Sequence, residues 1–296
     1  MKFKIKYSWR QFWKDLCWLA VVIVVAIVFA ALMRIFLLCS FKVPSYSMHP
    51  AIEPGDFIMV NKQIPGPRIY RNIRNIAPSG KVETKRFRGI RPVKRNDIIV
   101  FNFPCTDWNR IEMNTEVNYV KRCVAIPGDT FMIDNGIYKI TNAPEIEIGC
   151  RKYQERLSEQ FLNSPNKIPP LMFPYDTVNY KWTKKDFGPF YIPKSGDEIP
   201  IDTVNYILYS KVITYETGLQ MAVKNGEVCL GDSVIYNYAF AQNYYFMAGD
   251  YVLDSIDSRY WGLVPEDHII GKAIMIWKSE DMDTKKIRWE RLFKLL

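Results

Sequence analysis

The longest apolar run of the chain lies near its beginning. Residues 16–33 (LCWLAVVIVVAIVFAALM) carry no charged side chain. At a rise of about 1.5 Å per residue, a helix of this length nearly crosses a hydrocarbon core about 30 Å thick. A cleaved secretory signal has a shorter apolar region of roughly 7–15 residues, and here the sequence stays apolar after the single charge of Arg34. The pattern predicts one retained transmembrane helix, because the later apolar stretches are only as long as strands.

The two flanks of this run differ in charge. Residues 1–15 contain five Lys or Arg side chains, whereas only Arg34 and Lys42 follow closely after the run. The positive-inside rule assigns the more basic flank to the cytoplasm. We therefore predict a basic cytoplasmic tail (1–15), a transmembrane signal anchor (16–33) and an exported remainder on the outer, periplasmic face of the inner cell membrane.

Beyond the anchor, short apolar runs alternate with turns. The runs 57–60, 98–103 and 118–126 are bounded by Gly, Pro, Asn or Asp residues, a pattern typical of strands and tight turns. The composition changes at 143–243, where Pro- and Gly-rich stretches separate Tyr-rich segments that we predict to be strands, such as 206–209. We predict a mainly β, antiparallel exported domain (34–142 and 244–296) with an inserted, variable β-rich lobe (143–243).

Two basic segments have open interpretations. Residues 65–95 contain many Arg and Lys side chains with several Gly and Pro residues, and a solvated loop is favoured over a site for lipid headgroups. The last ten residues, 287–296, alternate basic and apolar side chains. They fit a closing strand and an interfacial segment equally well.

Composition narrows the class of protein. The 296 residues are 48% hydrophobic and 15% aromatic, enough for a sizeable core, which excludes a disordered chain. The net charge of +9 favours contact with anionic lipid rather than nucleic acid, because an exported domain rarely meets nucleic acid. Four cysteines outside the anchor region allow three disulfide pairings, and buried free thiols are an equal alternative: Cys105, Cys123, Cys150 and Cys229. No Cys/His spacing indicates a metal, and no cofactor is expected.

Hydrolysis by a serine requires a neighbouring base that is unprotonated at working pH. His49 and His268 are the only histidines. His49 lies two residues from Ser47, the candidate nucleophile, and this adjacency alone neither makes nor excludes a catalytic pair. A base normally comes from a segment distant from the nucleophile, and neither histidine is the favoured base. A lysine serves only if burial lowers its pKa. Lys121 lies between Val120 and the apolar run 123–126, although a lysine in a strand is more often exposed to solvent.

Two serines stand at alternate positions after Pro44. An extended backbone directs residues i and i+2 to one side, so the hydroxyl of Ser45 is predicted to reach the carbonyl that Ser47 attacks. Together with the backbone N–H of Ser47 it would form an oxyanion hole. The competing interpretation is an ordinary Ser/Pro loop that leaves the membrane.

Three segments in this order resemble the type I bacterial signal peptidases. The first contains FKVPSYSMHP (41–50) and GDFIMVNK (55–62), and the second contains KRNDIIVF (94–101) and YVKRCVAIPGD (119–129). The third contains Gly249-Asp250 and DSIDSRYWGLVP (254–265). The resemblance covers the anchor, 34–139 and 246–296, whereas 143–243 matches only as a variable insertion.

The resemblance implies a membrane-bound serine endopeptidase that removes N-terminal signal peptides from exported preproteins after Ala-X-Ala-like sites. It implies Ser47 as nucleophile, Lys121 as general base and Ser45 as oxyanion donor. Three further residues have implied supporting roles: Ser255 orients the lysine by a hydrogen bond, and Asp257 and Arg259 form an ion pair behind the site. The implied walls of the substrate pocket are Phe41, Val43, Met48, Ile52, Tyr119 and Val120.

The chain departs from the family pattern at two places. Tyr46 replaces a residue that is often Gly, and Tyr251-Val252-Leu253 replaces the usual continuation of the third segment. Both places lie next to implied site residues, so we expect them to alter the substrate groove. A self-cleaving regulator and an inactive membrane-tethered scaffold are the alternatives. Cleavage of a foreign preprotein in trans distinguishes a signal peptidase from the first, and labelling by a serine-directed acylating inhibitor distinguishes it from the second.

Overall fold

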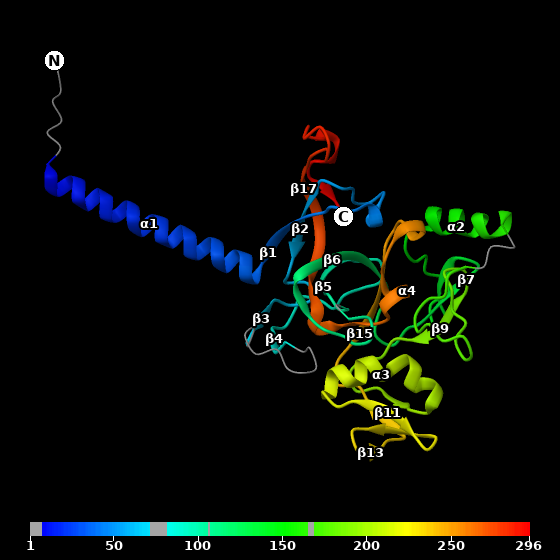
Figure 1. Ribbon diagram of the computed structural model, residues 1–296. Helices are drawn as coiled ribbons and strands as arrows, with labels where there is room; N and C mark the ends of the chain where they lie inside the picture. Colours follow the sequence, from blue (N-terminus) through cyan, green and yellow to red (C-terminus); the bar gives the residue numbers. More distant parts are fainter. Residues whose placement is uncertain (1–7, 72–81, 106, 165–168) are drawn as a thin grey trace.

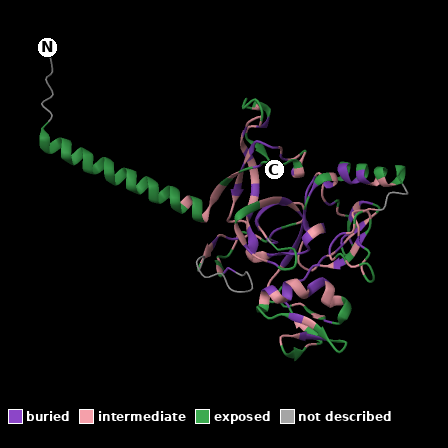
Figure 2. Ribbon diagram, viewed as in Figure 1, coloured by how far each residue is buried: buried purple, intermediate pink, exposed green. Residues whose placement is uncertain are grey.

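The computed structural model describes residues 8–71, 82–105, 107–164 and 169–296. The chain begins with helix α1 (Trp9–Phe36), which extends away from the remaining structure (Figure 1). None of its residues is buried (Figure 2), and it is long and apolar enough to cross a membrane. The predicted apolar helix is confirmed. It begins before the predicted span because Ser8 caps its first turn by accepting a hydrogen bond from the Gln11 N–H.

An antiparallel sheet forms the centre of the part of the chain that follows α1. Its strand order is β1-β2-β17-β5-β6-β15-β16, and β18 pairs with β17. The strands are β1 (Leu38–Lys42), β2 (Asp56–Asn61), β5 (Ile98–Phe103), β6 (Asn114–Ala125), β15 (Tyr244–Ala248), β16 (Val264–Pro265), β17 (Ile269–Ser279) and β18 (Lys294–Leu295). The predicted mainly antiparallel β fold is confirmed.

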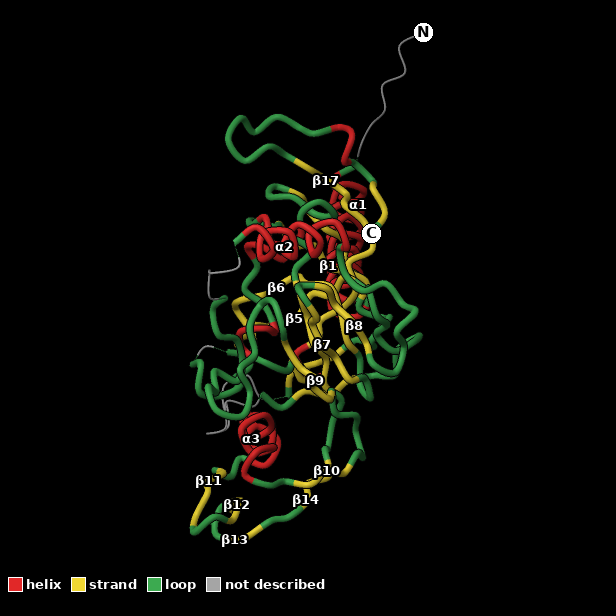
Figure 3. The backbone as a smooth tube through the Cα atoms, turned by 90° about the vertical axis from the view of Figure 1, so that its right-hand side faces the viewer, coloured by secondary structure: helices red, strands yellow, loops and turns green. Residues whose placement is uncertain are grey.

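Four smaller sheets surround this centre. They are β3-β4, β8-β7-β9, β10-β14 and β11-β12-β13. Their strands are β3 (Arg68–Tyr70), β4 (Thr84–Arg86), β7 (Thr130–Asp134), β8 (Ile137–Ile140), β9 (Phe187–Tyr191), β10 (Glu198–Pro200), β11 (Met221–Lys224), β12 (Glu227–Leu230), β13 (Ser233–Val234) and β14 (Asn237–Ala239). Figure 3 shows β10 to β14 gathered with a helix, α3, at one end of the molecule.

The segment 143–243 is more helical than predicted, because it contains α2 (Arg151–Asn163) and α3 (Thr203–Thr217) besides its strands. The stretch 206–209, predicted as a strand, lies inside α3. Its Tyr and Ile residues have good strand propensity, but the ends of the segment favour a helix. Asp202 accepts hydrogen bonds from two N–H groups of the first turn, and Gly218 ends the helix in the left-handed conformation.

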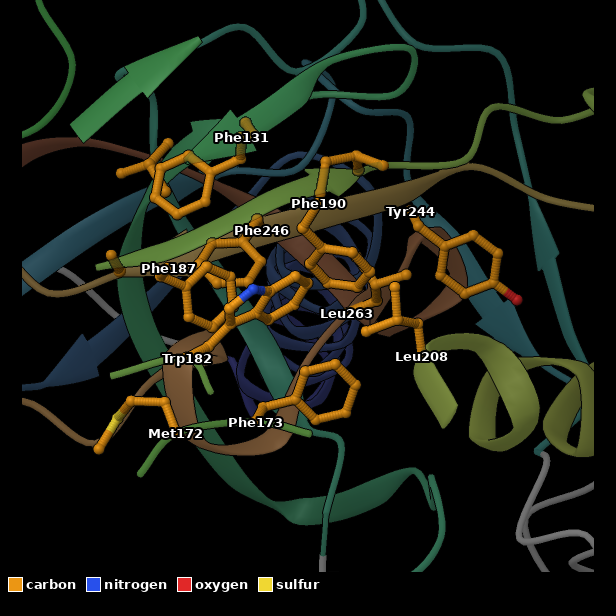
Figure 4. Close-up of a cluster of buried hydrophobic side chains, with 14 of the residues drawn as sticks. Phe131, Met172, Phe173, Trp182, Phe187, Phe190, Leu208, Tyr244, Phe246 and Leu263 are labelled. Carbon is orange, nitrogen blue, oxygen red and sulfur yellow. The ribbon is translucent and has the colours of Figure 1, made fainter. Parts of the chain in front are cut away.

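One hydrophobic core crosses the predicted boundaries of the lobe. Strand β9, inside 143–243, pairs with β7, which precedes it. The ring of Phe246 on β15 lies 4.6 Å from that of Phe131 and 6.2 Å from that of Phe190 (Figure 4). The division into 34–142 plus 244–296 and 143–243 stays a prediction, and this shared core indicates that the two parts fold against each other.

The basic segment 65–95 is not simply a solvated loop. Arg68 is buried and donates to the Asp267 carbonyl and to the side chain of Asn102. Arg86 donates to the Glu266 carbonyl at 2.8 Å and to the Ile269 carbonyl at 2.6 Å. The prediction is therefore wrong at these two arginines, because they supply the donors for carbonyls just before β17 and at its first residue. Residues 72–81 of the segment lie outside the described residues.

The C-terminal segment contains a closing strand, one of its two predicted alternatives. In β18, Lys294 and Leu295 pair with Ile276 and Met275 of β17, while Trp289 and Phe293 remain exposed. All six cysteines lie in the described ranges, and each is a free thiol, so no disulfide pairing is present among them.

Candidate active site

Ser47 lies on a single turn, η1 (Tyr46–Met48), that follows an extended residue, Ser45. Pro44 favours an extended backbone at Val43, and the fully buried side chain of Met48 anchors the turn in the apolar core. On the far side, the Tyr251 N–H donates to the Ser47 carbonyl at 3.1 Å. The turn that carries Ser47 is therefore held by the core on one side and by the segment after β15 on the other.

Lys121 projects from β6 toward this turn. Its Nζ donates to Ser47 Oγ at 2.5 Å, and Ser47 Oγ lies 3.3 Å from Ser45 Oγ. The lysine is only 3% exposed. Burial lowers its pKa to about 8; the nearby carboxylates of Asp257 and Asp250 oppose this shift, whereas Arg259 adds to it. The three side chains that the sequence selected for the reaction thus meet at one point.

An ion pair lies behind the lysine. Arg259 Nε and Nη2 each donate to an oxygen of the Asp257 carboxylate at 2.8 Å, and both side chains are fully buried. Burial alone would raise the pKa of Asp257, but Arg259 holds it below its ordinary value. The same carboxylate accepts from the Gly249 N–H at 2.9 Å. The pair therefore fixes the backbone beside Ser47.

The implied hydrogen bond from Ser255 to Lys121 is not present. Ser255 Oγ is buried and has no hydrogen-bond partner in the described part of the chain, whereas Lys121 donates to Ser47. This expectation is corrected: the hydroxyl lies against Gly249, where an added Cβ would stand 2.2 Å from it. The Ser255 hydroxyl instead occupies the space beside Gly249 in which a side chain at position 249 would lie.

Gly249 and Asp250 are the site residues whose roles the sequence analysis missed. A Cβ on Gly249 would also lie 2.5 Å from the Ser47 carbonyl oxygen, so only glycine fits beside the nucleophile turn. Asp250 accepts from Arg122 Nε and Nη2 at 2.6 and 2.5 Å, which fastens β6 to the segment after β15. A glycine directly after a fully buried strand is the signal in the sequence that could have indicated the role of Gly249. No local signal reveals the pairing of Asp250 with Arg122, because the two residues are far apart in the chain.

Most of the implied pocket walls lie together. Val43, Met48 and Ile52 are buried in one apolar cluster, and Phe41 and Val120 pack against it. Tyr119 belongs to a neighbouring aromatic group, where its ring stacks on Trp261 at 5.6 Å, yet it also lies 5.6 Å from Lys121 Nζ. All six implied wall residues therefore lie near the catalytic turn or the base, on two adjoining clusters.

Neither histidine contacts the nucleophile through a hydrogen bond in the described ranges. His49 Nδ1 lies 3.4 Å from Glu53 Oε1 without hydrogen-bond geometry. His268 is fully buried and its Nδ1 lies 2.9 Å from Asp267 Oδ1. Lys121 is thus the titratable group that the fold brings to Ser47.

The two departures from the family pattern meet beside this site. Tyr46 is 64% exposed, and the ring of Tyr251 lies 4.9 Å from that of Tyr153 on α2. These three residues and His49 border a cavity of about 450 Å³. The altered residues therefore extend the surface next to Ser47 rather than change the dyad.

Comparison with known proteins gives consistent matches. The family model described as signal peptidase, peptidase S26, matches residues 16–278. A signal peptidase I of Buchnera aphidicola subsp. Acyrthosiphon pisum is 32% identical over 253 residues, covering 84% of this chain and 71% of that protein. Signal peptidase I of Haemophilus influenzae is 26% identical, with coverages of 91% and 72%, and that of Helicobacter pylori is 25% identical, with coverages of 94% and 90%.

Proposed function

The chain belongs to the signal peptidase family, peptidase S26, and we propose that it performs the reaction of this family with Ser47 as nucleophile and Lys121 as general base. As a member of the family it is a serine endopeptidase that removes signal peptides from exported preproteins. The observation that carries the assignment of residues is the 2.5 Å contact between Lys121 Nζ and Ser47 Oγ at a buried position.

In the first step, neutral Lys121 accepts the proton of Ser47 Oγ while this oxygen attacks the carbonyl carbon of the scissile bond. The carbonyl oxygen becomes an oxyanion, which accepts hydrogen bonds from the Ser45 hydroxyl and the Ser47 N–H. Collapse of the tetrahedral intermediate breaks the C–N bond, and protonated Lys121 gives its proton to the leaving amine. The product is an ester between Ser47 and the signal peptide.

In the second step, water hydrolyses this ester. Neutral Lys121 takes a proton from the water as its oxygen attacks the acyl carbon, and the proton then passes to Ser47 Oγ as the ester bond breaks. The buried pair of Asp257 and Arg259 positions the surrounding backbone through the Gly249 N–H and the Val252 carbonyl. Its role is positioning rather than chemistry.

Small side chains before the cut fit the walls around Ser47. Val43, Met48 and Ile52 are almost fully buried, so they form a floor rather than a deep pocket. A shallow apolar floor admits a methyl group and excludes larger side chains. We therefore keep Ala-X-Ala-like sites as the proposed specificity, and the exposed ring of Tyr46 borders the same groove.

The proposed location is the inner membrane, with α1 as a single span and the catalytic part on the periplasmic face. The basic flank before the span supports a cytoplasmic N-terminus. Helix α1 ends at Phe36 and Ser47 follows within 11 residues, which keeps the nucleophile near the membrane surface. Membrane lipid is therefore a proposed partner, together with preproteins whose own signal helices present the cut at that depth.

Cleavage of a foreign Ala-X-Ala preprotein by the purified full chain in detergent tests the dyad. We expect Ser47→Ala and Lys121→Ala each to lose cleavage by several orders of magnitude, because the two residues act as one unit. Ser45→Ala should lose roughly 10²–10³-fold, while the exposed Lys139→Ala serves as an unchanged control. N-terminal sequencing of the product locates the cut, and undiminished cleavage by either dyad variant would refute the assignment.

A further inference from the structure

A polar cavity lies where helix α1 meets the exported part of the chain. It encloses about 320 Å³ and is bordered by the end of α1, by β1, and by residues of β3, β5 and β6. Figure 1 shows the end of α1 continuing into β1, with β3 and β4 nearby. The proposed catalysis uses none of its polar side chains, so the cavity needs a separate explanation.

The cavity is strongly cationic. Arg34, Lys62 and Arg68 border it, and no Asp or Glu is found among its described lining residues. Neutral polar side chains also line the cavity, namely the hydroxyl groups of Ser40, Tyr70 and Thr115 and the amides of Asn102 and Asn118. Three cations around one polar space without a carboxylate constitute the usual chemistry of a phosphate site.

Lys62 is held in place for such a role. Its Nζ donates to the carbonyls of Arg34 and Ile35 at 2.8 and 3.4 Å, which leaves one of its three N–H groups for a ligand. Burial lowers the pKa of Lys62; the interaction with Cys39 opposes this shift, and repulsion from Arg68 and Arg34 adds to it. An anion in the cavity would relieve that repulsion and stabilise the charged lysine.

The position of the cavity relative to the membrane indicates its ligand. A single residue, Leu37, separates the end of α1 at Phe36 from the start of β1 at Leu38. If α1 spans the membrane as proposed above, the cavity lies at the level of the headgroups, where phosphates are abundant. We propose that this cavity binds the phosphate of one anionic phospholipid headgroup and so fixes the catalytic part at the membrane surface.

Native mass spectrometry of the full chain in detergent micelles tests this site. Phosphatidylglycerol is titrated into the wild type, Arg34→Gln, Lys62→Gln and the control Lys181→Gln, which removes an exposed cation outside the cavity. We expect one tightly retained phosphatidylglycerol in the wild type and the control. Each cavity variant should bind it about fivefold more weakly, the usual effect of one basic side chain near lipid.

Two further probes distinguish the source of the phosphate. Zwitterionic phosphatidylcholine should bind several-fold more weakly than phosphatidylglycerol, and millimolar inorganic phosphate should not displace the retained lipid. Equal retention by the cavity variants and the wild type, an equal loss in Lys181→Gln, or displacement by free phosphate would each overturn the proposal. Release of the wild type from membranes by alkaline carbonate would instead refute the proposed anchor, so the two failures are distinguishable.

Discussion

Replacing Lys121 by Met is expected to abolish cleavage and at the same time to stabilise the folded protein at neutral pH. Lys121 is only 3% exposed, and Met fills a similar volume without a charge. Burial lowers the lysine pKa from its ordinary value of 10.5 to about 8. The proposed catalytic base is therefore a residue whose burial makes the folded state less stable at neutral pH.

The magnitude follows from linkage between protonation and folding. Below pH 8 the lysine is charged in both the folded and the unfolded state, and the lowered pKa corresponds to a penalty of roughly 3 kcal/mol. Loss of the hydrogen bond to Ser47 costs the variant about 1 kcal/mol. We expect Lys121→Met to be about 2 kcal/mol more stable than the wild type at pH 7.

The stability difference between the variant and the wild type is expected to change with pH in a defined direction. Between pH 8 and 10.5 the folded protein releases the proton of Lys121 while the unfolded chain keeps it, so the stability of the wild type rises with pH relative to the variant. The advantage of the variant should therefore disappear by about pH 10.5. Urea unfolding of both proteins in detergent across this range measures the difference. A stability difference that does not change between pH 7 and 10.5 would refute the reasoning.

Three further predictions concern the same site. Because burial lowers the pKa of Lys121 to about 8, kcat/KM should rise about tenfold per pH unit below pH 8 and level off above it, as initial rates from pH 6 to 9 would show. Asp257→Asn leaves the buried Arg259 charge unpaired and should cost about 3–5 kcal/mol in urea unfolding, whereas the exposed Asp134→Asn should cost under about 1 kcal/mol. Gly249→Ala places a methyl group 2.5 Å from the Ser47 carbonyl oxygen. It should reduce cleavage at least about a hundredfold while the circular dichroism spectrum stays unchanged. Wild-type activity of this variant would contradict the observed close approach.

The sequence predicted the local features well. The uncharged run 16–33 predicts a helix wherever it lies, because its length and composition are properties of one segment. The alternation of apolar runs and turns likewise predicted β6 and β5. The strand prediction failed at 206–209, because the strand propensity of these residues is outweighed by helix caps several residues away, at Asp202 and Gly218.

For the candidate site too, some features could be predicted from the sequence and others depend on the fold. The serines after Pro44 and the apolar setting of Lys121 are visible in the sequence, and the family pattern identified them as partners. Their meeting at 2.5 Å depends on how β6 lies against the turn at 46–48, which no local pattern encodes. The absent hydrogen bond of Ser255 shows that a shared motif does not fix every side-chain partner.

The sequence by itself determined the long apolar first helix, the class of fold and the family, because these follow from residue types and from the order of motifs along the chain. Only the tertiary structure decided how far the pKa of Lys121 falls, why Gly249 has no side chain, and that Arg34, Lys62 and Arg68 enclose one cavity. Those properties arise from desolvation and close contact between residues distant in the chain. Such contacts exist only after the sheet has formed.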